Sequence, residues 1–258
     1  MELPRNTFKH ALAAGGQQIG IWSTLATNVT VELIAAAGFD WMLLDMEHSP
    51  NELESVVGQL QAAQPYRTHA VVRVPWNDPV LLKRILDIGA QSVLVPMIDD
   101  AEQAKAAVAA MRYPPRGIRG VGGTTRATRW GRIAGYPHKA EGELCILLQV
   151  ETQTALGNIE AIAAVDGVDG IFVGPADLHA SFGHVGERHH AEVWPHIENA
   201  IRRIRAAGKA PGFLTSSETD ARRVMELGAQ FVAVGSDAAL LASASDSLCR
   251  RFLGQPGS

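Results

Sequence analysis

Four short apolar runs in this chain follow the same arrangement of glycine, brief loop and hydrophobic stretch. They lie in the segments Ala37–Asp45, Ile88–Pro96, Asp166–Gly174 and Leu227–Gly235. In each segment we expect the glycine to end a helix in a left-handed cap, before a short loop and a strand. The strands are apolar throughout rather than alternating, which indicates burial on both faces, as in a parallel sheet.

Further strands are predicted between these units, and segments with helical spacing of apolar residues separate them. Eight strand–helix units in 258 residues favour a closed (β/α)8 barrel, or TIM barrel, over an open doubly wound sheet. No Gly/Ser/Pro linker divides the chain, so we expect residues 1–258 to form a single domain. The further strands are Ile19–Trp22, Ala70–Val74, Cys145–Val150 and Ala210–Leu214, and the main helices are Asn51–Ala63, Pro79–Ile88, Ala101–Met111, Glu192–Ala207 and Thr219–Leu227.

The composition is that of an ordinary globular protein, with 47% hydrophobic and 19% charged residues and a net charge of −4. No basic excess points to nucleic acid or an anionic membrane as a partner. Neither a signal peptide nor an apolar run long enough for a bilayer is evident, so we expect a soluble, cytoplasmic protein. The two cysteines, Cys145 and Cys249, fit no redox or metal spacing, and Cys145 is predicted to be an inert core thiol.

Two carboxylates follow consecutive predicted strands. Glu151 comes directly after one strand and Asp177 shortly after the next. The carboxyl ends of barrel strands are where active sites lie, and hard oxygen ligands suit a divalent ion such as Mg²⁺ or Mn²⁺. Two protein ligands would leave open positions for water and a chelating substrate. The alternative is that one carboxylate caps a helix while the other is a solvated loop residue.

Three side chains with useful chemistry are expected on the same rim of the barrel. Asp45 and His48 follow a predicted strand, and an Asp–His pair would fix the imidazole tautomer and raise its basicity. Arg73 ends an otherwise apolar strand, which is a costly position unless the guanidinium meets an anion. A substrate carboxylate or an enolate oxygen would be such an anion.

The strand ends also offer groups for binding substrate. Gln149 lies two residues before Glu151 and therefore on the same side of its strand, in reach of substrate or metal-bound water. The turn that begins at Gly174 leaves the backbone N–H groups of Ala176 and Asp177 available for a small carboxylate.

A long irregular segment, from Tyr113 to about Glu143, is rich in glycine and arginine. A loop of this length in a compact domain is usually a functional lid or binding loop, and the alternative is a solvated insertion. The arginines would suit carboxylate ligands.

The placement of the lysines argues against a Schiff-base mechanism. None falls at the carboxyl end of a predicted strand, where an amine nucleophile of a barrel enzyme would be needed. The five lysines are Lys9, Lys83, Lys105, Lys139 and Lys209.

A series of motifs in this order resembles one family, the class II pyruvate aldolases, which include 4-hydroxy-2-oxoheptane-1,7-dioate and 2-keto-3-deoxy-glucarate aldolases. The resemblance covers nearly the whole chain, from about residue 8 to 252. The motifs are Asp45-x-Glu-His48, the strand end Val-Val-Arg73, Trp76-Asn-Asp-Pro79, Tyr113-Pro-Pro-x-Gly-x-Arg-Gly120, Gln149-x-Glu151 and Gly174-Pro-Ala-Asp-Leu178.

The resemblance implies reversible aldol cleavage of 4-hydroxy-2-oxo acids to pyruvate, or a close 2-oxo acid, and an aldehyde. It implies Mg²⁺, Mn²⁺ or Co²⁺ held by Glu151 and Asp177, with the 2-oxo acid chelating the metal. Arg73 would stabilise the enolate. His48, oriented by Asp45, would act through water as the base on the C4 hydroxyl.

Further residue roles and an assembly follow from the same resemblance. Gln149 would help to place the substrate and the metal waters, and Trp22 and Leu214 would line the aldehyde side. Family members typically form homohexamers with an exchanged C-terminal helix, and the apolar helix predicted at Ala238–Phe252 is compatible with that, although it could equally pack on its own barrel. Asp87 matches an aspartate that a neighbouring subunit contributes beside the histidine.

Two other functions stay open. A CoA-ester lyase of the citrate lyase β-subunit type would also use a metal and an acid pair, but no clear basic patch for CoA is evident. A non-catalytic barrel that binds a 2-oxo acid is the second, and it would not need an Asp–His pair. His179 stands where a small serine is common in the aldolases, so the identity of the aldehyde stays open. The metal that is used and the stereochemistry at C4 also stay open.

Overall fold

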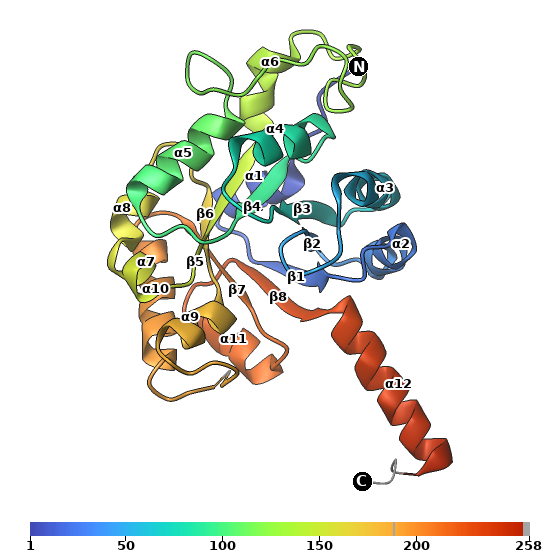
Figure 1. Cartoon of the computed structure of the whole chain (residues 1–258), viewed down its shortest axis with the longest axis vertical. Coiled ribbons are helices and arrows are strands. Elements are labelled where there is room, and N and C mark those ends of the chain that lie inside the picture. Colours follow the sequence, from blue (N-terminus) through green and yellow to red (C-terminus); the bar gives the residue numbers. More distant parts are fainter. Residues whose placement is uncertain (188, 255–258) are drawn as a thin grey trace.

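Eight parallel strands form a closed barrel at the centre of the fold, in the order β1 to β8 (Figure 1). The computed structural model describes residues 1–187 and 189–254. It confirms the predicted single-domain (β/α)8 barrel, and β5 and β7 have the predicted bounds. The strands are β1 (Gln18–Ser23), β2 (Trp41–Asp45), β3 (His69–Arg73), β4 (Ser92–Val95), β5 (Cys145–Val150), β6 (Gly170–Val173), β7 (Ala210–Leu214) and β8 (Phe231–Ser236).

Helices surround the barrel and begin and end at recognisable sequence signals. Asp78 caps one helix by accepting hydrogen bonds from the backbone N–H groups of Val80 and Leu81, both at 2.9 Å, and Pro79 opens it. The helices are α1 (Thr7–Ala13), α2 (Asn28–Ala37), α3 (Leu53–Ala63), α4 (Pro79–Asp87), α5 (Ala101–Met111), α6 (Tyr136–Lys139), the 3₁₀ turn η1 (Ala140–Glu143), α7 (Gln153–Gly157), α8 (Ile159–Ala163), α9 (Pro175–Ser181), α10 (Trp194–Ala206), α11 (Glu218–Glu226) and α12 (Asp237–Leu253).

The glycines of the four repeated segments have the predicted left-handed backbone. Gly38, Gly89, Gly167 and Gly228 have φ angles of 89°, 97°, 100° and 106°. A side chain would strain this conformation, so glycine stops each helix before the next strand.

Aromatic side chains fill the inside of the barrel. Trp41 and Phe231 are buried there with ring centroids 5.8 Å apart. They fit because the facing positions carry no side chain: a Cβ on Gly20 would lie 2.2 Å from the Trp41 ring, and one on Gly212 would lie 2.2 Å from the Phe231 ring. The interior is therefore a packed core, and the chemistry is confined to its ends.

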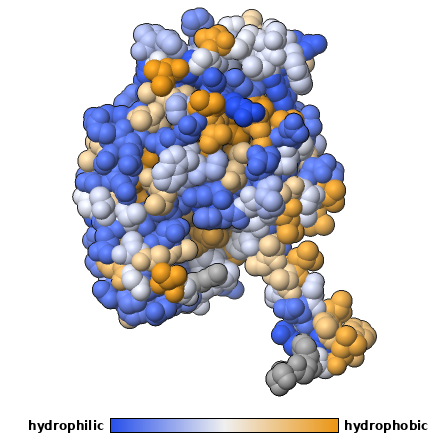
Figure 2. All heavy atoms as spheres, in the orientation of Figure 1, coloured by the Kyte–Doolittle hydropathy of each residue, from blue (hydrophilic) through white to orange (hydrophobic). Residues whose placement is uncertain are grey.

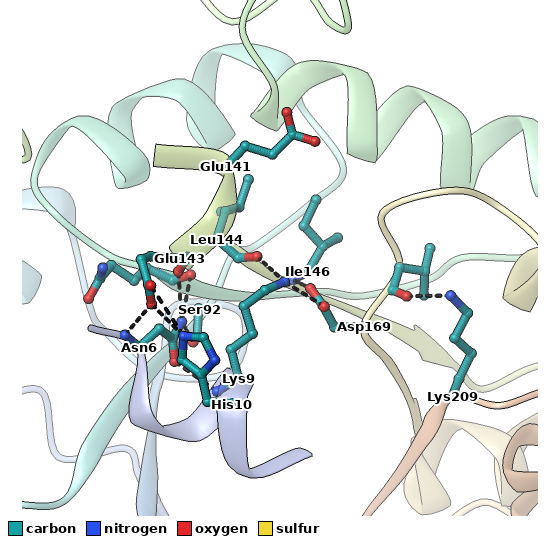
Figure 3. A network of polar contacts seen from close by, with 12 residues as sticks. Asn6, Lys9, His10, Ser92, Glu141, Glu143, Leu144, Ile146, Asp169 and Lys209 are labelled. Atoms are coloured by element: carbon teal, nitrogen blue, oxygen red, sulfur yellow. Dashed lines mark hydrogen bonds and ion pairs between the residues drawn. The ribbon is translucent and has the colours of Figure 1, made fainter. Parts of the chain in front are cut away.

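The amino-terminal helix α1 closes the amino end of the barrel through a network of polar contacts (Figure 3). Asn6 Nδ2 donates to Ser92 Oγ (2.9 Å), and Lys9 Nζ lies 2.6 Å from Asp169 Oδ1. Lys209 Nζ donates to a backbone carbonyl oxygen at the same end of the barrel, at 2.7 Å. Lys9 and Lys209 thus lie at the amino end of the barrel, opposite the carboxyl ends of the strands, where catalysis is expected.

The long segment from Tyr113 to Glu143 also lies at the amino end, because it follows α5 and leads into β5. Its buried Arg119 packs 4.5 Å over the Tyr113 ring and pairs with Asp87 at 2.9 Å. Arg112 and Arg116 pair with carboxylates of the same chain. The expectation that this segment is a lid over the catalytic rim of its own barrel is therefore wrong, whereas a ligand-binding role stays a prediction. The contacts of its arginines also show that it is not a loosely solvated insertion.

Helix α12 leaves the barrel and projects away from it (Figure 1). The buried carboxylate of Asp237 fixes its base by accepting hydrogen bonds from the backbone N–H groups of Thr24 (2.8 Å) and Leu25 (3.1 Å). Figure 2 shows apolar side chains gathered along the projecting part, where Phe252 is 79% exposed. The alternative in which the helix packs on its own barrel is thereby excluded. None of the helices in residues 1–187 and 189–254 has the length and apolarity of a membrane span.

Candidate active site

The predicted catalytic residues meet at the carboxyl ends of the strands. Asp45 ends β2 and Arg73 ends β3, and these two residues are direct partners in the parallel register of the strands. Glu151 follows β5 and Gly174 follows β6. The closed barrel brings residues far apart in the sequence onto one rim.

Arg73 is buried on this rim and is held by two carboxylates. Its Nε and one terminal nitrogen donate to the two oxygens of Asp45, at 2.8 and 2.7 Å. The other terminal nitrogen lies 2.8 Å from Glu47 Oε2, and the guanidinium carbon lies 5.1 Å from the centre of the Trp22 ring. The guanidinium is therefore fixed in one plane, as bidentate recognition requires.

The expected Asp45–His48 pair is not formed. Besides Arg73, the Asp45 carboxylate accepts hydrogen bonds from Trp22 Nε1 (3.2 Å) and the Glu47 backbone N–H (3.0 Å). His48 is exposed, and no hydrogen bond joins it to Asp45 in the described residues. The reason is register: Arg73 stands directly beside Asp45 on the next strand, whereas His48 lies farther out on the loop after β2.

Asp45 and Arg73 form an ionised pair despite their burial. Burial on its own raises the pKa of Asp45, but the hydrogen bonds and charge of Arg73 outweigh it and hold that pKa below its ordinary value. Burial likewise opposes the charge of Arg73, and Asp45 outweighs it, so the pKa of Arg73 is raised. Both partners carry full charge at neutral pH.

The carboxylate of Glu151 is buried and accepts two hydrogen bonds. The backbone N–H of Met97 donates to Oε1 (2.8 Å) and Gln149 Nε2 donates to Oε2 (2.6 Å). Met97 has a φ of 54°, an uncommon left-handed conformation that this contact helps to hold. Burial, with the negative charges of Glu47 and Asp177, raises the pKa of Glu151 to about 7.

Gly174 makes room for the side chain of Glu151. A Cβ at this position would lie 2.5 Å from Glu151 Oε2 and 3.3 Å from Gln149 Nε2. The glycine at the start of α9 is therefore a steric requirement of the carboxylate's position.

Glu47 is a site residue that the sequence analysis did not single out. Burial raises the pKa of Glu47 to about 7; Arg73 opposes that shift, and Asp45 and Asp177 add to it. Its signal in the sequence is its place in the loop directly after a predicted strand, two residues beyond Asp45.

The donor set fits a divalent cation. Glu47, Glu151 and Asp177 lie near enough for the charge of each to affect another's pKa, so negative charge accumulates on the rim. Gln149 Oε1 is buried and has no hydrogen-bond partner among the described residues. Oxygen ligands in an acidic cluster suit Mg²⁺ or Mn²⁺, and the unpaired amide oxygen suits a bound water. Exposed Asp177, in the first turn of α9, is accessible to such an ion.

The remaining predicted residues divide between the two ends of the barrel. Trp22 lies at the carboxyl end with its ring 5.5 Å from that of Phe172, and half-buried Leu214 packs on the same cluster. Ala176 is exposed at the start of α9. Asp87, by contrast, ends α4 at the amino end of the barrel and does not join the site of its own chain.

His179 is buried in α9, two residues beyond Asp177. Its Nδ1 is 2.6 Å from the backbone oxygen of Pro175, and its Nε2 is buried without a partner in the described residues. The imidazole therefore belongs to the wall behind the rim rather than to the solvated surface.

Comparison with known proteins shows which family the chain belongs to. Residues 18–244 match the HpcH/HpaI aldolase/citrate lyase family. The chain belongs to this family. A relative from Rhizobium etli, named pyruvate aldolase, is 56% identical over 98% of this chain and 99% of the relative.

Two further proteins agree with that assignment. A 4-hydroxy-2-oxo-heptane-1,7-dioate aldolase of Salmonella heidelberg is 54% identical over 96% of this chain and 95% of the relative. The crystal structure of an HpcH/HpaI aldolase/citrate lyase family protein from Burkholderia cenocepacia J2315 superimposes with a TM-score of 0.92 at 35% identity, covering 95% of this chain and 98% of that chain. The family resemblance drawn from the motifs is confirmed.

Proposed function

We propose that this HpcH/HpaI protein is a metal-dependent pyruvate aldolase. It cleaves 4-hydroxy-2-oxo acids reversibly to pyruvate, or a close 2-oxo acid, and an aldehyde. The observation that carries the proposal is the fixed Arg73 guanidinium beside the acidic cluster of Glu47 and Glu151. The names of relatives with 56% and 54% identity support the same activity.

Glu151 and Asp177 would hold the divalent ion, which is Mg²⁺, Mn²⁺ or Co²⁺, and the family generally depends on such a metal. When bound, the ion supplies Lewis-acid polarisation of the 2-oxo acid. The backbone N–H groups of Ala176 and Asp177 have no partner within the first turn of their helix and would receive the substrate carboxylate. Gln149 would position bound water and substrate.

Arg73 would face the keto oxygen, on which negative charge develops as the C3–C4 bond breaks. The bond's electron pair passes to C3 and the keto group, and the aldehyde leaves as the C4 hydroxyl loses its proton. Protonation of C3 then gives pyruvate. Asp45 would serve this step by holding Arg73 in plane, which replaces the expected role of orienting His48.

His48 would take the C4 hydroxyl proton through a water molecule. It is exposed on the rim, without a carboxylate partner from its own Asp45. Asp87 lies at the opposite end of its own barrel, so it would assist only the histidine of a neighbouring subunit. Trp22 and Leu214 would line the aldehyde side.

The assembly we propose is a homohexamer in which subunits exchange α12. The exposed side chains along the projecting helix support it, since Leu241 and Phe252 are 59% and 79% exposed. Sedimentation of the full chain as a hexamer, and of a chain lacking residues 238–258 as a smaller species, tests this.

Two free thiols, Cys145 and Cys249, accord with a cytoplasmic location.

The proposed activity is tested by supplying 4-hydroxy-2-oxo acids and measuring pyruvate through lactate dehydrogenase. Metal-dependent pyruvate release is the expected result. Cleavage of a citryl- or malyl-type CoA thioester, without cleavage of any 4-hydroxy-2-oxo acid, would favour the CoA-ester lyase instead. Binding of 2-oxo acids without turnover would favour the non-catalytic barrel.

A further inference from the structure

A second group of potential metal ligands lies in the loop that joins α9 to α10. The side chains of His184, His190 and Glu192 each place one ligand atom within 4.8 Å of the others. His184 Nε2 is 3.0 Å from Glu192 Oε2, and the imidazole rings of His184 and His190 are stacked with centroids 3.4 Å apart. None of these residues belongs to the rim that holds Glu151 and Asp177.

We propose that His184, His190 and Glu192 bind a divalent transition-metal ion, with Zn²⁺ as the preferred ion. Two imidazoles and one carboxylate form a donor set that suits Zn²⁺ and its neighbours in the transition series, whereas Mg²⁺ prefers oxygen ligands. In a tetrahedral site with bonds of about 2.0–2.1 Å, neighbouring ligand atoms lie roughly 3.3 Å apart. The 3.0 Å separation of His184 and Glu192 is close to that value. The His190 ring, which is stacked on that of His184, would have to rotate so that both rings direct a nitrogen at one ion.

Metal binding at this cluster would use the neutral form of both imidazoles, because a ring nitrogen binds a metal through its lone pair. Three protein ligands would leave a fourth position for water.

The backbone around the cluster holds its ligands in place. The His184 N–H donates to the His179 carbonyl oxygen at the end of α9 (2.8 Å), and the Val193 N–H donates to the His190 carbonyl oxygen (3.1 Å) before α10. Beside the cluster, His189 Nδ1 lies 3.3 Å from Asp220 Oδ2. A bound ion would join the two ends of this loop and stiffen it next to α9. The inference does not depend on the proposed aldolase activity.

The test is a Zn²⁺ titration of the EDTA-treated protein against a chromophoric zinc chelator, with millimolar Mg²⁺ present to fill the oxygen-ligand site. Wild type is expected to bind one tight equivalent of Zn²⁺ per chain. The double variant His184→Asn/His190→Asn should lose it, and Glu192→Gln alone should weaken it about tenfold or more. His138→Asn, at an exposed histidine of α6, is the matched control and should bind as wild type.

A Glu151→Gln/Asp177→Asn variant separates this site from the rim, because it should keep the tight equivalent. X-ray absorption of the zinc-loaded protein should show nitrogen ligands of imidazole type, and zinc should raise the Tm of wild type but not of the double variant. Equal zinc binding by wild type and the double variant would overturn the proposal. Loss of the tight equivalent only when Glu151 and Asp177 are replaced would do so as well.

Discussion

The Arg73 guanidinium and the Asp45 carboxylate meet edge to edge, joined by two hydrogen bonds of 2.8 and 2.7 Å between neighbouring strands. This pairing fixes the plane of the guanidinium and leaves its other terminal nitrogen 2.8 Å from Glu47 Oε2. The buried guanidinium is therefore a rigid hydrogen-bond donor at the rim. A donor held rigidly in advance stabilises the charge of a transition state most strongly.

Replacing Arg73 with lysine keeps the charge but removes the planar fork. Because Lys cannot match the two oxygens of Asp45 and donate a further hydrogen bond in the same plane, we expect kcat for aldol cleavage to fall about 10²–10³-fold. Steady-state kinetics measure the effect. Arg67→Lys, at a side chain that is 71% exposed, is the control and should leave kcat unchanged. A wild-type kcat for Arg73→Lys would contradict the role given to this pair.

Adding a methyl group at Gly174 should displace the Glu151 carboxylate. The new Cβ would stand 2.5 Å from Oε2, so the carboxylate or α9 must move. We expect Mn²⁺ affinity to fall about tenfold or more, with a stability loss on the order of 1–3 kcal/mol. Gly142→Ala serves as control because a Cβ there meets nothing within 4 Å. Unchanged Mn²⁺ binding by Gly174→Ala would show that Glu151 is not a metal ligand.

Replacing His48 with alanine should separate two halves of the reaction. Removal of the C4 hydroxyl proton needs the imidazole, whereas exchange of the pyruvate methyl protons does not pass through that hydroxyl. We expect cleavage of a 4-hydroxy-2-oxo acid to slow about 10²–10⁴-fold, while methyl-proton exchange is much less affected. The two rates are measured on the same preparation. Cleavage at the wild-type rate would remove His48 from the mechanism.

His69 should make folding stability sensitive to mild acid. It stacks on Phe8, its Nε2 lies 2.8 Å from Ser92 Oγ, and burial lowers its pKa from 6.5 to about 4. The unfolded chain therefore binds the proton more readily, so the stabilisation is complete above pH 6.5 and is lost as the pH falls toward 4. The loss is on the order of 2–3 kcal/mol.

Urea unfolding of wild type and His69→Gln between pH 7 and 4 measures that loss. The free-energy difference between the two proteins should change across this range, and His138→Gln should run parallel to wild type. Parallel curves for wild type and His69→Gln would show that the imidazole is not held neutral.

The barrel was predictable because its signals are local and repeated. Gly38 and Gly228 mark the ends of helices by a conformation that favours glycine, and the apolar strands after them indicate a sheet buried on both faces. The position of Glu151 followed from the same strand periodicity. These inferences depend on neighbours in the sequence.

Partners across strands were harder to predict. Asp45 was assigned to His48, three residues away, because sequence spacing does not reveal that Arg73 stands beside it in the barrel register. The long segment after Tyr113 was expected to be a lid or binding loop because its composition suits ligands, yet its Arg119 pairs with Asp87 at the other end of the barrel. The cluster of His184 with Glu192 likewise appears only when the loop is folded.

The most direct test of the central claim is exchange of the pyruvate methyl protons in D₂O, followed by NMR. The protein is first treated with EDTA, and Mn²⁺ or Mg²⁺ is then restored. The account predicts exchange that appears only with the metal and is abolished by Arg73→Ala, because both the metal site and the guanidinium are needed to stabilise the enolate. Absence of exchange with every metal tested would contradict a pyruvate aldolase site at this rim.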